Sequence, residues 1–111
     1  MRLTKIFIFI LLLSAVIIGQ TNKGSITGTV TDQKGAAIPG ATVTITSVGT
    51  NQKITLTTSD SGNFTASSLE PVAYNVVVEA ASFKKALISK VKVDTSSTAT
   101  VNITLEVGDI A

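Results

Sequence analysis

Apolar and polar residues alternate along most of the chain after residue 24. In the segment Ala41-Thr42-Val43-Thr44-Ile45-Thr46, the odd positions are apolar and the even positions are threonines. Successive side chains of a strand point to opposite faces, so this pattern predicts a half-buried β-strand. The same alternation predicts further strands over residues 25–31, 54–57, 63–67, 74–80 and 99–107.

The segment from Phe83 to Val93 follows the alternation less cleanly. Leu87, Val91 and Val93 share one parity, whereas Ile88 has the other. An extra residue in a strand reverses the parity of all residues beyond it. We therefore predict either a β-bulge near Ser89 or a strand that is partly buried on both faces.

Turn-forming residues separate the predicted strands, as in Asp32-Gln33-Lys34-Gly35. Gly35 and Gly40 let the chain reverse before the next predicted strand, which starts at Ala41. Seven short strands at even spacing, with no convincing helix, indicate an all-β fold. We predict a single antiparallel β-sandwich of about seven strands. Its predicted core consists of Val30, Val43, Ile45, Leu56, Phe64, Tyr74, Val76, Val78, Val101, Ile103 and Leu105.

The first residues differ from the rest of the chain. Arg2 and Lys5 precede the run Ile6–Ile18, in which Ser14 is the one polar residue. This run is shorter than the roughly 20 residues of a membrane-spanning helix, and it is typical of a hydrophobic signal helix that is cleaved on export. The alternative is an uncleaved N-terminal anchor.

We predict a signal peptide over residues 1–19 with cleavage after residue 19 or 20, a linker over residues 20–23, the sandwich over 24–107 and a tail over 108–111. The protein would then be exported to the periplasm, the outer membrane or the extracellular medium.

Charge and cysteine content exclude several classes of protein. The chain has 9 basic and 7 acidic residues, and loss of Arg2 and Lys5 with the signal peptide leaves a net charge of zero. Nucleic-acid binding needs a retained basic surface, so we predict no nucleic-acid partner. The chain has no Cys, so neither disulfides nor a lipid-modified cysteine can stabilise or anchor the domain.

The chain also has no His, so it lacks the usual general base and most transition-metal ligands. We predict no catalytic, metal or cofactor site and no enzyme activity. A Ser–Lys catalytic pair could be formed, for example, by the neighbours Ser89 and Lys90. Adjacent residues of a strand face opposite ways, so we expect that this pair cannot act together. Asp32, Asp60 and Asp94 could bind calcium through turn oxygens, but we favour the interpretation that they cap turns.

Three other groups of residues have a structural and a functional interpretation. Lys84, Lys85, Lys90 and Lys92 could bind an anionic ligand, although lysines also protect edge strands from intermolecular pairing, which we favour. The Ser/Thr-rich outer faces could bind a glycan, but such sites usually have aromatic platforms, and we place Phe64, Tyr74 and Phe83 in the core. Asn63 and Asn102 begin sequons that could be glycosylated, but three-residue motifs also occur by chance, and we give these two little weight.

Four segments, in order along the chain, resemble the carboxypeptidase regulatory-like domain. They are residues 28–43, with Gly28-Thr29-Val30 and Pro39-Gly40-Ala41; Thr58–Phe64, which resembles a T-x-D-x-G-x-F turn; Leu69–Tyr74, which resembles an L-P-P-G-x-Y corner; and Ala80–Phe83, which resembles A-x-G-F/Y. The resemblance covers about residues 24–107. Val72 and Ser82 stand where the family usually has Gly, which leaves the turn type of the 70–74 corner open.

The resemblance implies a transthyretin-like, Ig-like sandwich, similar to starch-binding folds. Such domains accompany carboxypeptidase catalytic domains or precede TonB-dependent outer-membrane receptors. We therefore expect an exported, non-catalytic accessory module with a structural or interaction role, either as a fragment of such a receptor or free-standing; the alternative is a carbohydrate-binding module. Its partner, a protein or a glycan, is not identified by the sequence. Membrane contact would come only from the signal segment or from a region beyond Ala111.

Overall fold

The computed structural model describes residues 22–108. The predicted signal peptide and most of the predicted tail lie outside the described residues. Between residues 22 and 108, no helix is long and apolar enough to cross a membrane. The strands are β1 (Gly24–Asp32), β2 (Thr42–Ser47), β3 (Lys53–Thr57), β4 (Asn63–Leu69), β5 (Ala73–Glu79), β6 (Ala86–Lys92), β7 (Thr98–Thr100) and β8 (Ile103–Leu105).

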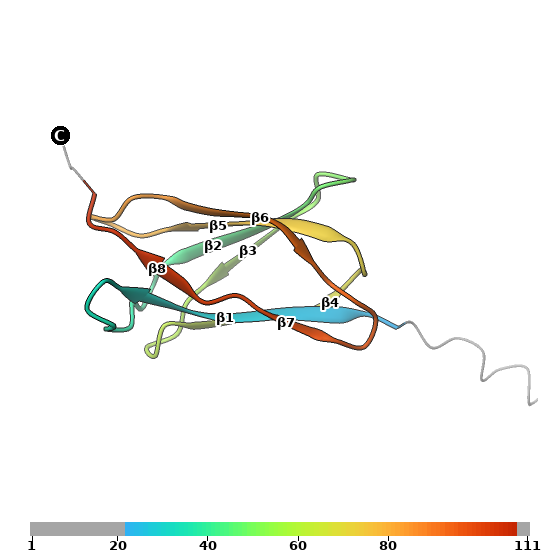
Figure 1. Cartoon of the computed structure of the whole chain (residues 1–111), viewed down its shortest axis with the longest axis horizontal. Helices are drawn as coiled ribbons and strands as arrows, with labels where there is room; N and C mark the ends of the chain where they lie inside the picture. Colours follow the sequence, from blue (N-terminus) through green and yellow to red (C-terminus); the bar gives the residue numbers. More distant parts are fainter. Residues whose placement is uncertain (1–21, 109–111) are drawn as a thin grey trace, which may run out of the picture.

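These strands form two sheets that pack face to face (Figure 1). Sheet 1 has the order β4-β1-β7, and β8 also pairs with β1. Sheet 2 has the order β3-β2-β5-β6, and all of its pairs are antiparallel. The predicted all-β sandwich is confirmed. It leaves β4 as one edge of sheet 1, and β3 and β6 as the two edges of sheet 2.

The prediction of one last strand over residues 99–107 was wrong in two respects. It is broken into β7 and β8, and both run parallel to β1 rather than antiparallel. The break lies beside Gly28, where a Cβ atom would overlap the carbonyl oxygen of Val101. At this point the Val101 N–H donates to the Thr27 carbonyl (2.8 Å), and the Thr29 N–H donates to Asn102 Oδ1 (3.2 Å). An asparagine side chain thus replaces one backbone acceptor of the ladder.

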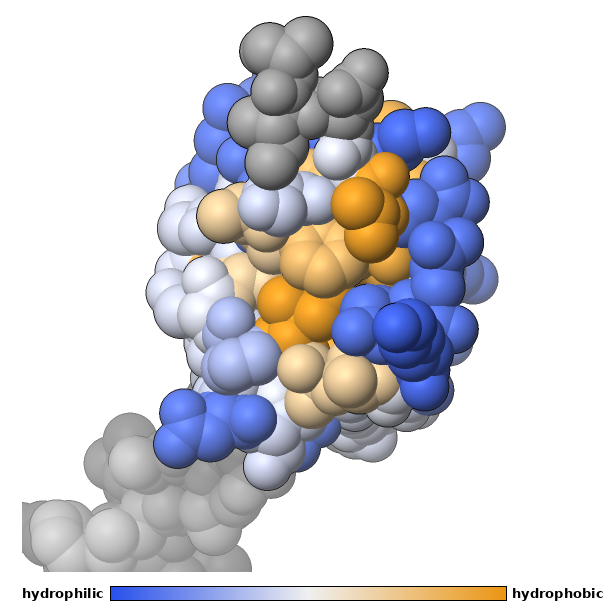
Figure 2. All heavy atoms as spheres, turned by 90° about the vertical axis from the view of Figure 1, so that its left-hand side faces the viewer, coloured by the Kyte–Doolittle hydropathy of each residue, from blue (hydrophilic) through white to orange (hydrophobic). Residues whose placement is uncertain are grey.

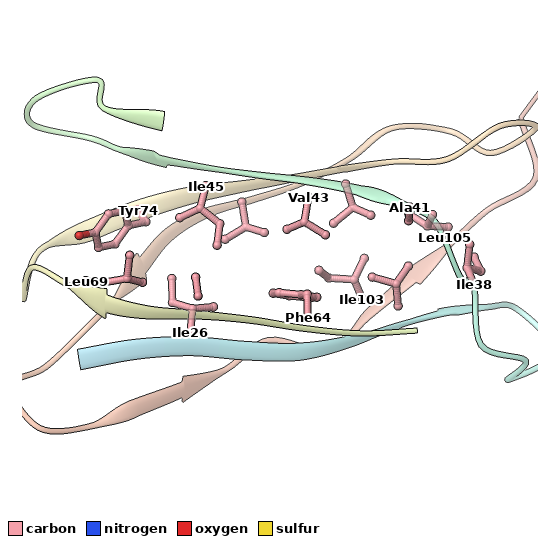
Figure 3. Close-up of a cluster of buried hydrophobic side chains, with 14 of the residues drawn as sticks. Ile26, Ile38, Ala41, Val43, Ile45, Phe64, Leu69, Tyr74, Ile103 and Leu105 are labelled. Carbon is pink, nitrogen blue, oxygen red and sulfur yellow. The ribbon is translucent and has the colours of Figure 1, made fainter. Parts of the chain in front are cut away.

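The core lies between the two sheets, and inward side chains from both interdigitate there (Figure 3). Nine of the eleven predicted core residues are buried. Leu56 and Val101 are only partly buried, because Leu56 lies on the edge strand β3 and Val101 lies in the gap between β7 and β8. The core also contains residues that the prediction omitted, namely Ile26, Ile38, Ala41, Ala66, Leu69 and Val93.

Strand β6 contains the bulge that its irregular pattern predicted. Tyr74 pairs with Val91 and Val76 pairs with Ile88, so the two residues Ser89 and Lys90 lie opposite Asn75 alone. Lys90 has a φ of +57°, and its N–H donates to Asn75 Oδ1 (3.1 Å). The bulge lets both Ile88 and Val91 pack against the core, whereas Leu87 faces outward and is 61% exposed.

The connection between β1 and β2 is fixed by the buried hydroxyl group of Thr58. This hydroxyl donates to the Ile38 carbonyl (2.8 Å) and accepts from the Ala41 N–H (2.8 Å). Gly35 and Gly40, with φ of +85° and +72°, make the two reversals that the sequence predicted. The loop therefore places Ile38 over one end of the core and starts β2 in register.

Candidate functional site

The acidic residues form no cluster that could hold a metal ion in the part of the chain that the structure describes. No group of three or more His, Cys, Asp or Glu side chains comes together there. Asp32 Oδ1 accepts from the Lys34 and Ala36 N–H groups, each at 2.9 Å. The prediction that Asp32 caps its turn is thus confirmed, and its carboxylate is occupied by that turn.

The lysines of the 84–92 region lie on or just before the edge strand β6, as the protective interpretation requires. Three of these lysines form ion pairs. The distance from the lysine Nζ to a carboxylate oxygen is 3.9 Å for Lys84 and Glu106, 2.9 Å for Lys85 and Glu79, and 3.8 Å for Lys92 and Asp94. These pairs are exposed, so each contributes little to stability. They do show that three of the four lysines already have carboxylate neighbours, which argues against a free anion-binding patch.

The outer face of sheet 1 differs from the lysine-rich edge at β6 in its charge. Every side chain that alternates with the buried positions of its strands is a hydroxyl or an amide, and none carries a charge. Register pairs place most of these residues side by side on neighbouring strands, such as Thr27 between Thr65 of β4 and Thr100 of β7. We call this surface the polar face; it consists of Ser25, Thr27, Thr29, Thr31, Asn63, Thr65, Ser67, Thr98, Thr100, Asn102 and Thr104.

Hydrogen bonds between strands order the polar face. Thr27 Oγ1 donates to the Phe64 carbonyl and lies 3.1 Å from Thr65 Oγ1, so Thr65 must donate in that second pair. The hydroxyl groups of Ser25 and Thr98 are also 3.1 Å apart. Because these contacts restrict the rotamers, the face can contact a partner with a smaller loss of side-chain entropy.

Thr29 lies at the centre of the polar face between two asparagines. Its hydroxyl donates to Asn63 Oδ1 (2.8 Å), and its N–H donates to Asn102 Oδ1 (3.2 Å). An amide whose oxygen is engaged in this way retains two N–H donors. The row Asn63–Thr29–Asn102 therefore offers neutral hydrogen-bond donors to a ligand. These asparagines also begin the two sequons, and Asn102 lies between strands rather than within one.

No aromatic side chain lies on the polar face. Phe64 and Tyr74 are 3% and 5% exposed, and Phe83 is partly buried against the core. The prediction that the three aromatics belong to the core is confirmed for the first two, and Phe83 lies at its margin. The face consequently offers hydrogen bonding but no surface for stacking on a sugar ring.

One end of the sandwich has two hollows. The first, of about 450 Å³, adjoins the polar face and is lined mainly by Ser25, Ser67, Ser68, Ser97 and Thr98. The second, of about 690 Å³, has a mixed lining. Its polar groups include Lys23 and Glu70, whose side chains form an ion pair (3.3 Å).

Tyr74 lies in the lining of the larger hollow and fixes the 70–74 corner. Its hydroxyl donates to the Glu70 carbonyl (2.9 Å), which also accepts from the Val72 N–H (2.8 Å). Burial, and secondarily the nearby Glu70 carboxylate, raises the pKa of the Tyr74 phenol. Val72 does not have a positive φ, whereas Ser82, the other residue in place of a usual glycine, has a φ of +71°.

The sequence matches the carboxypeptidase regulatory-like domain family over residues 25–106, which is most of the chain. The chain belongs to this family. In this carboxypeptidase regulatory-like domain, the four segments that carry the resemblance form turns of the sandwich and the strand residues beside them, and the first segment also includes the second half of β1. No curated protein matches the sequence significantly.

Solved structures similar to this domain come from proteins of different kinds. The Bacillus anthracis TIE protein is 24% identical, with a TM-score of 0.67 over 78% of this chain and 17% of that one. A putative carbohydrate binding protein from Bacteroides uniformis is 18% identical (TM-score 0.62; 77% of this chain, 42% of that one). Catechol 1,2-dioxygenase from Acinetobacter radioresistens is 14% identical (TM-score 0.62; 82% and 54%).

At these identities the likeness shows the fold alone. This chain also spans less than two thirds of each of these proteins. The same sandwich therefore occurs in an enzyme and in other proteins, and a function must be argued from the surface of this chain.

Proposed function

We propose that this carboxypeptidase regulatory-like domain is an exported, non-catalytic accessory module that contacts a partner protein through its polar face. The observation that supports this most is the face itself, because it offers eleven uncharged hydroxyl and amide side chains on one sheet, several of them held by hydrogen bonds between strands. The sequence has no His and no Cys, so it lacks the commonest general base and the thiolate nucleophile, which supports a non-catalytic role.

We further propose that the domain is the N-terminal extension of an outer-membrane receptor, exported by a signal peptide at residues 1–19. The supporting observations are the family and the sequence pattern of residues 2–18. Two measurements test this. N-terminal sequencing of the exported protein should begin at Gln20 or Thr21, and the reading frame beyond Ala111 should encode a plug and a barrel. Intact Met1 in a membrane fraction would instead support an anchor.

A photo-cross-linking residue tests the use of the polar face. Thr65 and Thr55 are exposed threonines on the edge strands β4 and β3, on the outer faces of sheets 1 and 2 respectively. We expect a cross-linker at Thr65, in exporting cells, to capture a defined exported protein and one at Thr55 to capture none. Equal adducts at both positions, or none at Thr65, would contradict the proposal.

The second candidate is a carbohydrate-binding module. The donor row at Asn63 and Asn102 and the serine-lined hollow favour it, as does the name of the Bacteroides uniformis protein. Among residues 22–108 no aromatic side chain is exposed, which opposes it. We expect calorimetric titration with a panel of glycans to give no saturable heat, and the isolated domain to hydrolyse neither peptides nor glycosides. Saturable binding that Asn63→Ala abolishes would reverse this preference.

A further inference from the structure

Strand β4 is the least protected edge of the two sheets. Lysines lie along the edge at β6, β3 begins with Lys53, and β7 and β8 have three residues each with a break between them. Charged residues and short, interrupted strands are means by which edge strands avoid pairing with other chains. By contrast, β4 has seven residues, of which none is charged and none is proline. Its irregular part lies at its end, where Ser67 and Ser68 are both opposite Ser25.

The hydrogen-bond pattern shows which backbone groups of β4 are directed outward. The Val30 N–H donates to the Gly62 carbonyl (2.8 Å), and the pairing with β1 keeps this register as far as Ala66. In an antiparallel pair, every second residue of a strand directs both its N–H and its C=O at the neighbouring strand. Phe64 and Ala66 are therefore directed at β1, and the residues that alternate with them direct their backbone groups away from it.

Thr65 and Ser67 carry the backbone groups that a further strand could use. Asn63 is also directed outward, but its carbonyl accepts from the Ser59 N–H (2.9 Å) and its N–H donates to Ser59 Oγ (3.2 Å). Thr65 and Ser67 face no other strand of the described chain, because β4 is the edge of sheet 1. Their N–H and C=O groups can therefore pair with one side of an added strand.

The inner face of β3 is incompletely covered on the same side of the sandwich. Ile54 pairs with Ile45 and so faces inward with it, yet Ile54 is 38% exposed whereas Ile45 is fully buried. Ile54 lines the larger hollow together with Leu69 of β4. Leu56, the next inward residue of β3, is also only partly buried. One further strand beside β4 would lie over β3 and cover these two apolar side chains.

The position beside β4 also defines the side chains that an added strand needs. Figure 2 views one end of the sandwich and shows hydrophobic residues in the middle with hydrophilic residues around them. An added strand must continue this division, with apolar residues over Ile54 and Leu56 and polar residues beside the polar face. Neighbouring outer residues of β4, such as Thr65, are uncharged, so uncharged polar residues fit there best.

We propose that β4 accepts an extended, uncharged segment of the partner protein, with alternating apolar and polar residues, as an additional strand of sheet 1. Backbone hydrogen bonds to Thr65 and Ser67 and burial of Ile54 drive the binding. A single segment fits this position better than the β4 edge of a second copy, because a second copy would bring its own β3, with its Lys53, against the first. This inference rests on the proposed function and specifies how the partner binds beside the polar face.

A peptide with the chain's own alternating sequence tests the proposal. The probe is synthetic Ala-Thr-Val-Thr-Ile-Thr-Ser, the sequence of residues 41–47, acetylated and amidated so that it has no charge. In NMR spectra of the full chain, we expect saturable shifts of the Ile54 and Leu56 methyl signals and slower hydrogen exchange of the Thr65 and Ser67 amides. A control peptide with Asp in place of its Val and Ile should cause neither change.

Two pairs of variants locate the binding. Thr65→Pro removes an outward donor and leaves the bonds to β1, so the domain should remain folded by circular dichroism and bind the probe at least about tenfold more weakly. The matched control is Thr55→Pro, at an outward-directed position of the edge strand β3, which should bind as the parent does. Ile54→Ser should also weaken binding, whereas Leu87→Ser, at an exposed apolar residue of β6, should not.

Three results would overturn the strand addition. They are the absence of saturable shifts, shifts that both Thr65→Pro and Ile54→Ser leave unchanged, and a dimer of the domain alone that protects the Thr65 and Ser67 amides, which would make a second copy the occupant. These measurements use purified protein, whereas the cross-linking at Thr65 in exporting cells tests the proposed function. Cross-linking without peptide binding would therefore remove the strand addition and retain the polar face as the contact surface.

Discussion

Gly28→Ala should destabilise the domain strongly through a backbone clash. The added Cβ would overlap the Val101 carbonyl oxygen and lie 2.7 Å from Cζ of Phe64. The neighbour that must move is backbone, and its movement breaks the bonds from Val101 N–H and to Asn102 Oδ1. Each hydrogen bond contributes about 1 kcal/mol, and overpacking adds about 1–3 kcal/mol. The unfolded Ala variant has less conformational entropy to lose on folding than the glycine chain, which offsets about 0.5–1 kcal/mol of this destabilisation.

The net expectation is a loss of roughly 2–4 kcal/mol in the free energy of unfolding, from the sum of these effects. Urea denaturation followed by circular dichroism measures it; with a slope of about 1–2 kcal/mol per molar urea, the midpoint should fall by about 2 M.

Two other glycines separate the clash from ordinary backbone effects. Gly49 has open space around it and no positive φ, so Gly49→Ala should leave the midpoint nearly unchanged. Gly35 also has open space but a φ of +85°, so Gly35→Ala should show only the conformational cost of about 1 kcal/mol. If Gly28→Ala matched Gly49→Ala, the close approach of Val101 to β1, and with it the parallel pairing, would be refuted.

Three further predictions concern single side chains. Thr58→Val should cost about 2 kcal/mol, because it leaves a buried N–H without its acceptor, whereas the exposed Thr57→Val should cost little; urea midpoints compare them. Ser82→Gly should raise the melting temperature by relieving about 1 kcal/mol of left-handed strain, whereas Ser61→Gly should not. Tyr74→Phe should flatten the loss of stability with pH above the ordinary tyrosine pKa of 10.0. The raised folded-state pKa of Tyr74 favours folding below pH 10.0, and this contribution is lost as pH rises through the folded value; denaturation at several alkaline pH values tests the difference.

Much of the fold followed from alternation, because a strand between core and solvent must place its apolar residues on one face. The irregular 83–93 segment was informative for the same reason, since the change of parity at Ile88 located the bulge at Ser89 and Lys90. The parallel course of the last strands could not be predicted in this way. Alternation defines the two faces of a strand, but it carries no information about its neighbours or their direction.

Less of the candidate site could be predicted. The sequence showed hydroxyl-rich outer positions on several strands, but only pairing shows that those of β1, β4, β7 and β8 form one uncharged surface. The engagement of Thr29 by Asn63 and Asn102 joins residues 34 and 73 positions apart. No local pattern predicts such a contact. The polar face becomes visible only when the strand pairing is known and the charged residues on each outer face are counted.

The position of β1 in sheet 1 has a consequence for the order of folding. This N-terminal strand completes its sheet only with β7 and β8, the last two strands of the described chain. Contacts between residues this far apart form slowly, because closing the long intervening loop costs entropy before the contacts stabilise it. While the chain is being synthesised, β1 can pair with β4 alone, and its other edge stays open until residue 105 has emerged. The domain should therefore acquire its cooperative stability only after its C-terminal strands are free, so a nascent chain ending at Lys92 would still be susceptible to proteases.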